Sequence, residues 1–447
     1  MSKSIKILHL TPHLGSGVGA VVLNYLDKVK DDQRFEHSVV CLDDANNLAK
    51  SSAALAGYVL LDKMHADINA LLELIAAADI VLVHWWNHPL LYDFLVRNPL
   101  PPSRVIFWSH VTGLPAPNNY TVKLLNYPDQ MVFTTPLSLN LPIVKTMSQQ
   151  LPGHFSAIWS TGGVERLNWL KLKSHTGINI GYAGSLDPAK LHPDFLKLCA
   201  QVNIPDLHFI IVGGPDDQSQ SLAKEATRLG LSDRFTFTGF VSEEEKWRLL
   251  STFDLFAYPL APHHYGSSDQ ILQEAMSIGL VPIVFANPME SLMVDYGGAG
   301  IIANNSTDYI KALEDLATDN IKRQRLGERA KNYAQANYSL VKMEQAWDDL
   351  FAKTLTLPKT TKKWPLNTGT KQITAHDIFF ESLGDDGQAF LDYCLAADDL
   401  SKEKAISAIK NLSTSPNWRS ASKGTAHQYH AFFPDDDYLA LWSSWTH

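Results

Sequence analysis

The segment from His263 to Phe285, HHYGSSDQILQEAMSIGLVPIVF, constrains the fold of this chain more than any other. Its apolar side chains recur at the spacing of one helix face, which predicts a helix. This stripe consists of Ile271, Ala275 and Ile278. Gly279 stands where a helix ends on a left-handed residue, and Val281 to Phe285 is a short apolar strand. Loop, helix, turn and strand together indicate an α/β sheet.

The start of this helix is predicted to bind an anion. Ser267 is expected to cap the helix, and Gln270 three residues later completes a capping box. The first N–H groups of a helix have no partner within it, so those of Gly266 to Asp269 fit a diphosphate. Glu274 follows on the same helix and could accept hydrogen bonds from a vicinal diol such as a ribose. The alternative is an ordinary helix–strand unit, because both end signals are common.

The string EAMSIG followed by VPIV resembles the nucleotide-sugar motif of retaining glycosyltransferases with the GT-B fold, of the group 1 or family 4 type. The resemblance implies that Glu274 holds the donor ribose and that Gly266, Ser267 and Ser268 contact the donor. The first glutamate of that motif falls on Gly266 and is absent. Asp269 is the nearest acid, and we expect it to take over the contact with the sugar as a catalytic residue.

Composition excludes several other classes. The chain has 447 residues and a formal net charge of -9, which argues against nucleic acid as a partner. Three widely spaced cysteines, Cys41, Cys199 and Cys394, indicate buried thiols in a reducing compartment. No signal peptide or membrane span is predicted. We expect a cytoplasmic protein, with a peripheral position at the inner membrane face as the alternative.

The first strand, Ile5 to Thr11, leads into a predicted glycine loop from Pro12 to Gly19 and then a helix from about Ala20 to Lys28. The loop resembles the one that faces the donor phosphates and the acceptor in GT-B enzymes, and Gly17 and Gly19 carry that match. A plain tight turn is the alternative.

Two further strands, Asp79 to Val83 and Arg104 to Trp108, end in clusters of histidine and tryptophan. In open parallel sheets a ligand binds beyond the carboxyl ends of the strands. His110 occupies the place of a histidine that lies close to the reacting sugar in relatives, so it is our first catalytic candidate. Trp85 and Trp86 could stack on an acceptor sugar. The alternatives are a loop histidine with a structural role and a tryptophan turned into the core.

The second half begins with a strand from Ile178 to Ala183, followed by Gly184. Relatives carry an arginine and a lysine after this glycine, both on the donor diphosphate. Lys190 matches the lysine, whereas Ser185 replaces the arginine. A single positioned ammonium still stabilises a leaving diphosphate, and an exposed surface lysine is the alternative. The turn of Gly239, Phe240 and Val241 resembles the one that lines the nucleotide base pocket.

The predicted fold class is α/β, with two Rossmann-like domains and a small C-terminal helical appendage. The first domain, on the acceptor side, spans residues 1–165, and the nucleotide-sugar domain spans residues 177–335. A helix at 336–355 is expected to pack back on the first domain, 356–370 to be a linker, and 371–447 to form the aromatic-rich appendage.

The resemblance implies a metal-independent hexosyltransferase without a cofactor, acting on a nucleotide-diphosphate sugar and a glycan, lipid-linked or protein acceptor. Surface glycan or glycoconjugate synthesis is the expected setting. Three alternatives stay open: a non-catalytic GT-B subunit that stabilises or targets a partner, a nucleotide-sugar epimerase, and an oxidoreductase, which the misfit glycine loop disfavours. The appendage could mediate a homo-oligomer or bind a partner protein.

Overall fold

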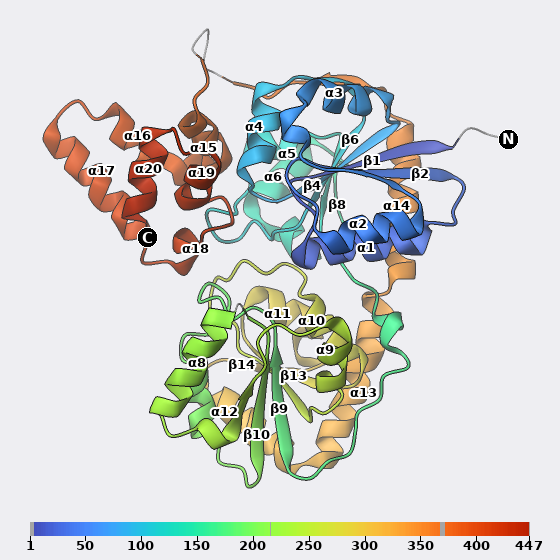
Figure 1. Cartoon of the computed structure of the whole chain (residues 1–447), viewed down its shortest axis with the longest axis vertical. Coiled ribbons are helices and arrows are strands. Elements are labelled where there is room, and N and C mark those ends of the chain that lie inside the picture. The colour runs from blue at the N-terminus through green and yellow to red at the C-terminus, as the bar shows by residue number, and fades with distance from the viewer. Residues whose placement is uncertain (1–3, 215, 367–371, 447) are drawn as a thin grey trace. The chain divides into compact units, whose positions relative to one another are not determined.

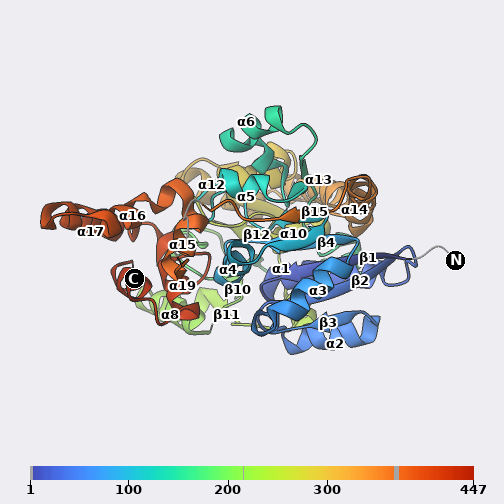
Figure 2. The same cartoon turned by 90° about the horizontal axis from the view of Figure 1, so that it is seen from above.

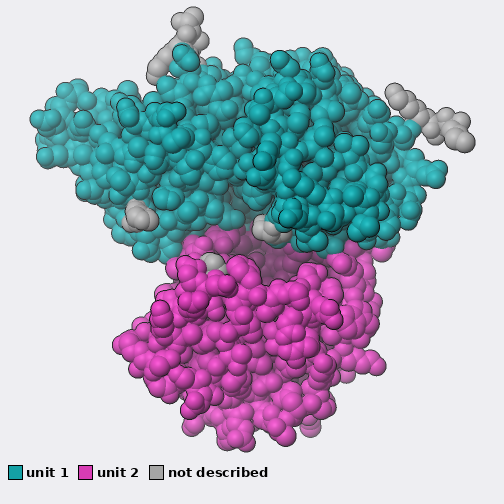
Figure 3. Space-filling model, viewed as in Figure 1, with its two compact units in different colours: residues 1–160, 343–447 teal, residues 161–342 magenta. Residues whose placement is uncertain are grey.

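The computed structural model describes residues 4–214, 216–366 and 372–446. The chain folds as two compact units, residues 1–160 with 343–447, and residues 161–342 (Figure 3). Each unit contains one parallel sheet with helices around it (Figure 1). The predicted α/β class with two Rossmann-like sheets and C-terminal helices is confirmed, while the predicted domain bounds stay predictions.

The sheet of unit 1 has seven parallel strands in the order β3-β2-β1-β4-β6-β7-β8. Its strands are β1 (Ile5–Thr11), β2 (Phe35–Cys41), β3 (Val59–Leu61), β4 (Ile80–Trp85), β6 (Val105–Ser109), β7 (Gln130–Phe133) and β8 (Phe155–Ala157). The helices of this part are α1 (Ser16–Val29), α2 (Asn47–Ala56), α3 (Ile68–Ala77), α4 (Pro89–Arg97), α5 (Val122–Asn126) and α6 (Pro142–Gln150). β4 and β6 are buried along their whole length, as expected for strands covered on both faces.

The sheet of unit 2 has six parallel strands in the order β11-β10-β9-β12-β13-β14. These are β9 (Ile178–Ala183), β10 (Leu207–Val212), β11 (Phe235–Phe237), β12 (Leu255–Tyr258), β13 (Val281–Phe285) and β14 (Ile301–Ala303). The helices are α7 (Phe195–Gln201), α8 (Asp216–Arg228), α9 (Glu243–Leu250), α10 (Gln270–Ser277), α11 (Pro288–Met293), α12 (Ser306–Thr318) and α13 (Asn320–Asn337).

The C-terminal part from residue 343 belongs to unit 1. It contains most of α14 (Leu340–Leu355) and the short strand β15 (Thr360–Lys362), which pairs antiparallel with β5 (Leu100–Ser103). The last helices are α15 (Ala375–Leu383), α16 (Gln388–Leu395), α17 (Asp399–Leu412), α18 (Pro416–Arg419), α19 (Ala426–Phe432) and α20 (Asp437–Trp445). Figures 1 and 2 show α15 and α19 beside α4.

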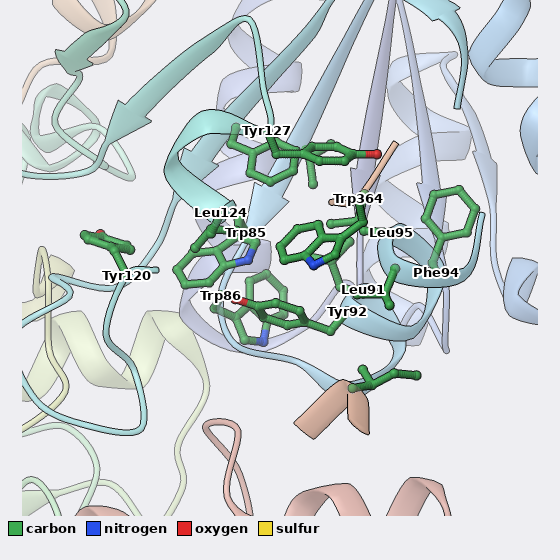
Figure 4. Close-up of a cluster of buried hydrophobic side chains, with 14 of the residues drawn as sticks. Trp85, Trp86, Leu91, Tyr92, Phe94, Leu95, Tyr120, Leu124, Tyr127 and Trp364 are labelled. Carbon is green, nitrogen blue, oxygen red and sulfur yellow. The ribbon is translucent and has the colours of Figure 1, made fainter. Parts of the chain in front are cut away.

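The predicted linker 356–370 is not a free connection where the structure describes it. Besides β15, it contains Trp364, which is 1% exposed and packs against Tyr92 and Tyr127 (Figure 4). Lys362 of β15 forms an ion pair with Asp129 at 2.7 Å. Burial of the Trp364 side chain fixes this segment on unit 1, which its polar composition does not reveal. Residues 367–370 of the predicted linker, and residues 371 and 447 of the predicted appendage, lie outside the described residues.

Two local predictions about helix starts are wrong. α1 begins at Ser16, so Gly17 and Gly19 lie in its first turns and not in a loop; the N–H of Gly19 donates to Gly15 O at 3.1 Å. α10 begins at Gln270 with Asp269 and not Ser267 at the cap position, and the Asp269 side chain makes no cap hydrogen bond. The predicted end of α10 is confirmed, because Gly279 has φ +91°.

Candidate functional site

In unit 2 the strand order reverses at β9, which lies between β10 and β12. Ligands of open α/β sheets bind at such a switch point, outside the carboxyl ends of the strands. The loops that follow β9 and β12 therefore border the candidate site. They contain residues 184–194 and 259–269, and the second loop leads directly into α10.

Lys190 and Asp269, predicted separately, form an ion pair here. Lys190 Nζ lies 2.7 Å from Asp269 Oδ1, and the side chains are 12% and 9% exposed. Burial raises the pKa of Asp269, but the Lys190 ammonium and then His264 lower it, and the net shift is downward. Burial lowers the pKa of Lys190, whereas Asp269 raises it, and the net shift is upward. Both groups are therefore charged at neutral pH, and the ammonium lies in the loop after β9.

Glu274 projects from α10 onto a second lysine. Its Oε2 lies 2.8 Å from Lys246 Nζ of α9, and the two side chains are 18% and 21% exposed. Lys246 also lies 3.4 Å from Glu243, an exposed residue of its own helix. Burial raises the pKa of Glu274 above its usual range, and Lys246 opposes that shift only in part. The sequence analysis did not identify Lys246 as the ion-pair partner of Glu274. A lysine near the acidic start of a helix carries no local pattern that predicts such a contact.

The loop before α10 is organised by a buried histidine that the sequence analysis did not single out. His264 Nε2 lies 2.9 Å from Glu290 Oε2, and its Nδ1 accepts from the N–H of Gly266 at 3.0 Å. The N–H of Gly266 is thus bonded inside the loop, contrary to the expectation that it is unpaired. A Cβ at Gly266 would lie 2.9 Å from His264 Nδ1 and 3.1 Å from Asp269 Oδ2. The position that holds glutamate in the motif is therefore crowded in this chain.

The floor of the site is made of glycine backbone. Gly184, Gly213 and Gly239 follow β9, β10 and β11, and their φ angles are +145°, +131° and +66°. A Cβ at Gly213 would overlap the carbonyl oxygen of Gly184, so these strand ends approach each other closely. Phe240 is 70% exposed. Val241 beside it is half-buried.

In unit 1 the strand order reverses at β1, which lies between β2 and β4. Three of the predicted residues gather near the end of β4. The N–H of His110 donates to Trp85 O at 2.8 Å, and its ring lies 6.2 Å from that of Trp86. His110 is 8% and Trp86 7% exposed. Burial lowers the pKa of His110 to about 3, so its imidazole is neutral at pH 7.

Trp85 is the last residue of β4 and points into the core. It is 0% exposed and packs against Tyr92 and Tyr120 (Figure 4). This burial contradicts its predicted stacking on an acceptor sugar. Trp86 follows the strand and belongs to the same buried cluster, but it keeps 7% exposure.

The C-terminal part contributes residues to the same edge of unit 1. The ring of Phe432 lies 4.9 Å from that of His88, and a Cβ at Gly424 would overlap the buried side chain of Asn87. Burial and then Lys423 lower the pKa of His13. Lys423 therefore adds positive electrostatic potential beside His13. The sequence does not predict this proximity, because the two residues are far apart along the chain.

The described ranges 4–214, 216–366 and 372–446 contain no group of three or more metal-ligating side chains suited to an ion. None of the helices in those ranges is both long enough and apolar enough to cross a bilayer.

Residues 167–333 match the family model of glycosyl transferases group 1. Two curated proteins are similar to parts of the chain. The D-inositol 3-phosphate glycosyltransferase of Mycolicibacterium smegmatis is 29% identical over 126 residues, 26% of this chain and 29% of that protein. The spore coat protein SA of Bacillus subtilis is 29% identical over 149 residues, 30% of this chain and 37% of that protein. The chain thus matches about a third of the length of these relatives.

Solved structures agree over a longer range. The Anabaena protein HepE in complex with UDP and glucose superposes with a TM-score of 0.60 at 16% identity, covering 78% of this chain and 100% of HepE. The sucrose-phosphate synthase of Thermosynechococcus elongatus superposes with a TM-score of 0.60 at 13% identity, covering 79% of this chain and 99% of the synthase. At such identities the agreement establishes the fold. Residues 167–333 therefore form a domain of the glycosyl transferases group 1 family, and the chain as a whole has the GT-B fold.

Proposed function

We propose that this chain is a retaining glycosyltransferase that moves a hexose from a nucleotide-diphosphate donor to an acceptor hydroxyl. The observation that carries the proposal is a pair of half-buried charges beside the switch point of unit 2. Lys190 and Glu274 are both held there by an opposite charge, Asp269 and Lys246, at 2.7 and 2.8 Å. A cation suits a diphosphate, and a carboxylate suits the vicinal hydroxyls of a ribose.

In this proposal the donor diphosphate competes with Asp269 for the ammonium of Lys190. The leaving diphosphate gains negative charge as the glycosidic bond breaks, and a cation already in place stabilises that charge. Asp269 then remains beside the transferred sugar, near the position of the absent motif glutamate. Lys190 supplies the positive charge, so we propose that transfer needs no metal ion and that a chelator leaves the rate unchanged.

The donor base and the acceptor belong to the proposal as well. HepE has been solved with UDP-glucose, so uridine nucleotides are tested first. Gly239, Phe240 and Val241 would line the base, and His110 and Trp86 of unit 1 would contact the transferred sugar and the acceptor. A glycan, a lipid-linked sugar or a protein in surface glycoconjugate synthesis is the proposed acceptor.

The first test measures binding of UDP, GDP, ADP and CMP by thermal shift, with Glu274→Gln and Glu243→Gln as a matched pair. Both changes remove one negative charge beside Lys246, but only Glu274 lies on α10. A nucleotide at 100 times its Kd stabilises the native state by about 2.7 kcal/mol. We expect one nucleotide to stabilise the wild type and the Glu243→Gln variant, and Glu274→Gln to bind it at least about tenfold more weakly.

Equal loss in both variants would mean that charge near Lys246, and not the contact of Glu274, governs binding. Absence of a shift with every nucleotide would contradict the donor site altogether.

A second candidate function is a non-catalytic GT-B subunit. The crowding around Gly266 favours it, because a glutamate cannot be accommodated there without moving His264 or Asp269. Incubation of the purified chain with the sugar nucleotide that it binds distinguishes the cases. Free nucleotide released with or without an acceptor supports transferase chemistry, an epimerised sugar nucleotide supports an epimerase, and unchanged donor supports the non-catalytic subunit.

A further inference from the structure

Four histidines form one continuous row of hydrogen bonds in unit 1. His37 Nδ1 lies 2.9 Å from His9 Nε2, His9 Nδ1 lies 3.0 Å from His84 Nε2, and His84 Nδ1 lies 3.1 Å from His110 Nε2. They come from β2, β1, β4 and the residue after β6, so the row crosses neighbouring strands and ends at the candidate catalytic histidine.

The row lies on one face of the sheet. Leu8 and Leu10 of β1 belong to the large apolar cluster on one face, so His9 between them faces the other. There it packs near Tyr25 of α1, and Trp108 beside the row contacts Trp347 of α14. His9 is 0% and His84 1% exposed. The two middle rings, His9 and His84, are therefore shielded from solvent, whereas His37 at one end of the row is half-buried.

Burial keeps all four rings neutral. It lowers the pKa of His37 to about 4 and that of His110 to about 3, and it holds those of His9 and His84 well below the usual range. A neutral imidazole has one N–H and one bare nitrogen. His9 and His84 each use both nitrogens inside the row, so each donates to one neighbour and accepts from the other.

Only two proton arrangements satisfy every bond in such a row. In one, all four rings carry the proton on Nδ1, and the first three each donate to the next ring in the direction of His110. In the other, all four carry it on Nε2, and the last three each donate to the next ring in the direction of His37. The tautomer of His110 is therefore coupled to that of His37, three hydrogen bonds away.

The outer nitrogen of His37 distinguishes the two arrangements. His37 Nε2 is buried, and the part of the chain that the structure describes offers it no hydrogen-bond partner. Burying an unpaired N–H is less common in proteins than burying an unpaired acceptor. Nε2 of His37 is therefore the bare nitrogen, and its proton is on Nδ1.

We propose that His37, His9 and His84 are positioning residues that hold His110 with its proton on Nδ1. Resting on the proposed function, this makes His110 a hydrogen-bond donor through Nδ1 toward the oxygen atoms of the transferred sugar. It also denies His110 the role of a general base at that nitrogen. An imidazole outside such a row would be able to change tautomer.

The test is a long-range ¹H–¹⁵N correlation spectrum of the full chain labelled with ¹⁵N-histidine at pH 7, which separates the two tautomers and the imidazolium form. The His110→Gln spectrum assigns the signal of His110. We expect His110 in the wild type as a single neutral form with the proton on Nδ1. In His84→Leu, which breaks the row, we expect its shifts to move toward an average of both tautomers.

His84→Gln is the conservative variant, because its amide donates to Nε2 of His110 and preserves the Nδ1–H form. His208→Leu, a change outside the row, should leave the signal of His110 untouched. A wild-type proton on Nε2, an averaged signal, or no change in a folded His84→Leu would overturn the inference. If His84→Leu does not fold, the wild-type and His84→Gln spectra still decide. No nucleotide is needed, so failure of the proposed function would be seen separately in the binding assay.

Discussion

At the scale of single residues, the Lys190–Asp269 pair gives the sharpest expectation for stability. We predict that Asp269→Asn destabilises unit 2 by about 3 kcal/mol, because it leaves the ammonium buried without its partner. Hydrogen exchange of peptides from β9 and β12 at pH 7 measures the change in local free energy of opening. Asp315→Asn, which removes an exposed partner of Lys311, is the control and should change little.

The pH dependence of that difference follows from the pKa of Asp269, which is lowered in the folded chain. Stabilisation by such a group is complete above the ordinary aspartate pKa, about 4, and is lost as pH falls through the folded value. We therefore expect the difference between wild type and Asp269→Asn to be constant from about pH 7 to 5 and to shrink below about pH 4. A difference that grows on acidification would contradict the ion pair.

Several site residues could be predicted from sequence because a local signal marks them. Glu274, Lys190 and Asp269 lie close to residues that mark the ends of predicted helices and strands. Their roles in binding and catalysis remain predictions. The residues that contact them, Lys246, Glu290 and His264, could not be predicted from sequence. An ion pair between distant segments depends on which strands become neighbours in the sheet. His9 and His37 carried no signal for the same reason.

At the scale of elements, the three glycines after β9, β10 and β11 show why the strand ends of unit 2 can approach. Gly213 has φ +131°, which L-residues rarely adopt, and a Cβ there would overlap Gly184. We predict that Gly213→Ala costs about 3 kcal/mol or more and weakens nucleotide binding. Urea unfolding followed by hydrogen exchange of β10 and β9 measures the loss.

Gly230→Ala is the matched control for Gly213→Ala, because Gly230 also has a positive φ, +70°, but no atom lies near its Cβ position. It should cost only about 1 kcal/mol, the penalty of the left-handed backbone alone. Equal effects of the two variants would mean that backbone conformation, and not the close approach of Gly184, explains the glycine at position 213.

Hydrophobic periodicity predicted that these helices and strands exist, but it did not predict where some of the helices start. The apolar runs DIVLV and RVIFW predicted strands, and β4 and β6 are found there. α1 begins at Ser16, four residues before the predicted start at Ala20. Gly17 and Gly19 cost some helix propensity, but tertiary packing overrides that preference.

At the scale of the whole molecule, the aromatic C-terminal part is built into unit 1. Ile378, Phe379, Tyr429 and Trp442 belong to the same buried cluster as Trp85 and Tyr92. The surface that suggested a partner protein is thus largely covered by the chain itself. Leu395 and Leu400, at 71% and 63%, are among the apolar side chains that stay exposed on this part.

We predict that Trp442→Ala destabilises unit 1 by about 3 to 5 kcal/mol, because a large side chain at 0% exposure leaves a cavity. Hydrogen exchange should lose protection in α4 as well as in α15 and α20, since the C-terminal helices pack on α4. Leu400→Ala is the control and should change stability by less than about 0.5 kcal/mol. Unchanged protection of α4 would show that the C-terminal helices are independent of the sheet.

The sequence by itself determined the α/β class, the positions of most strands and the family motif around Glu274, because periodicity, turn residues and short motifs are local. Only the tertiary structure decided which charges meet, that Trp85 is buried, and that four histidines from separate segments form one row. Those features depend on strand order and on the face to which each side chain points. Both are fixed by packing between distant segments, which no local pattern records.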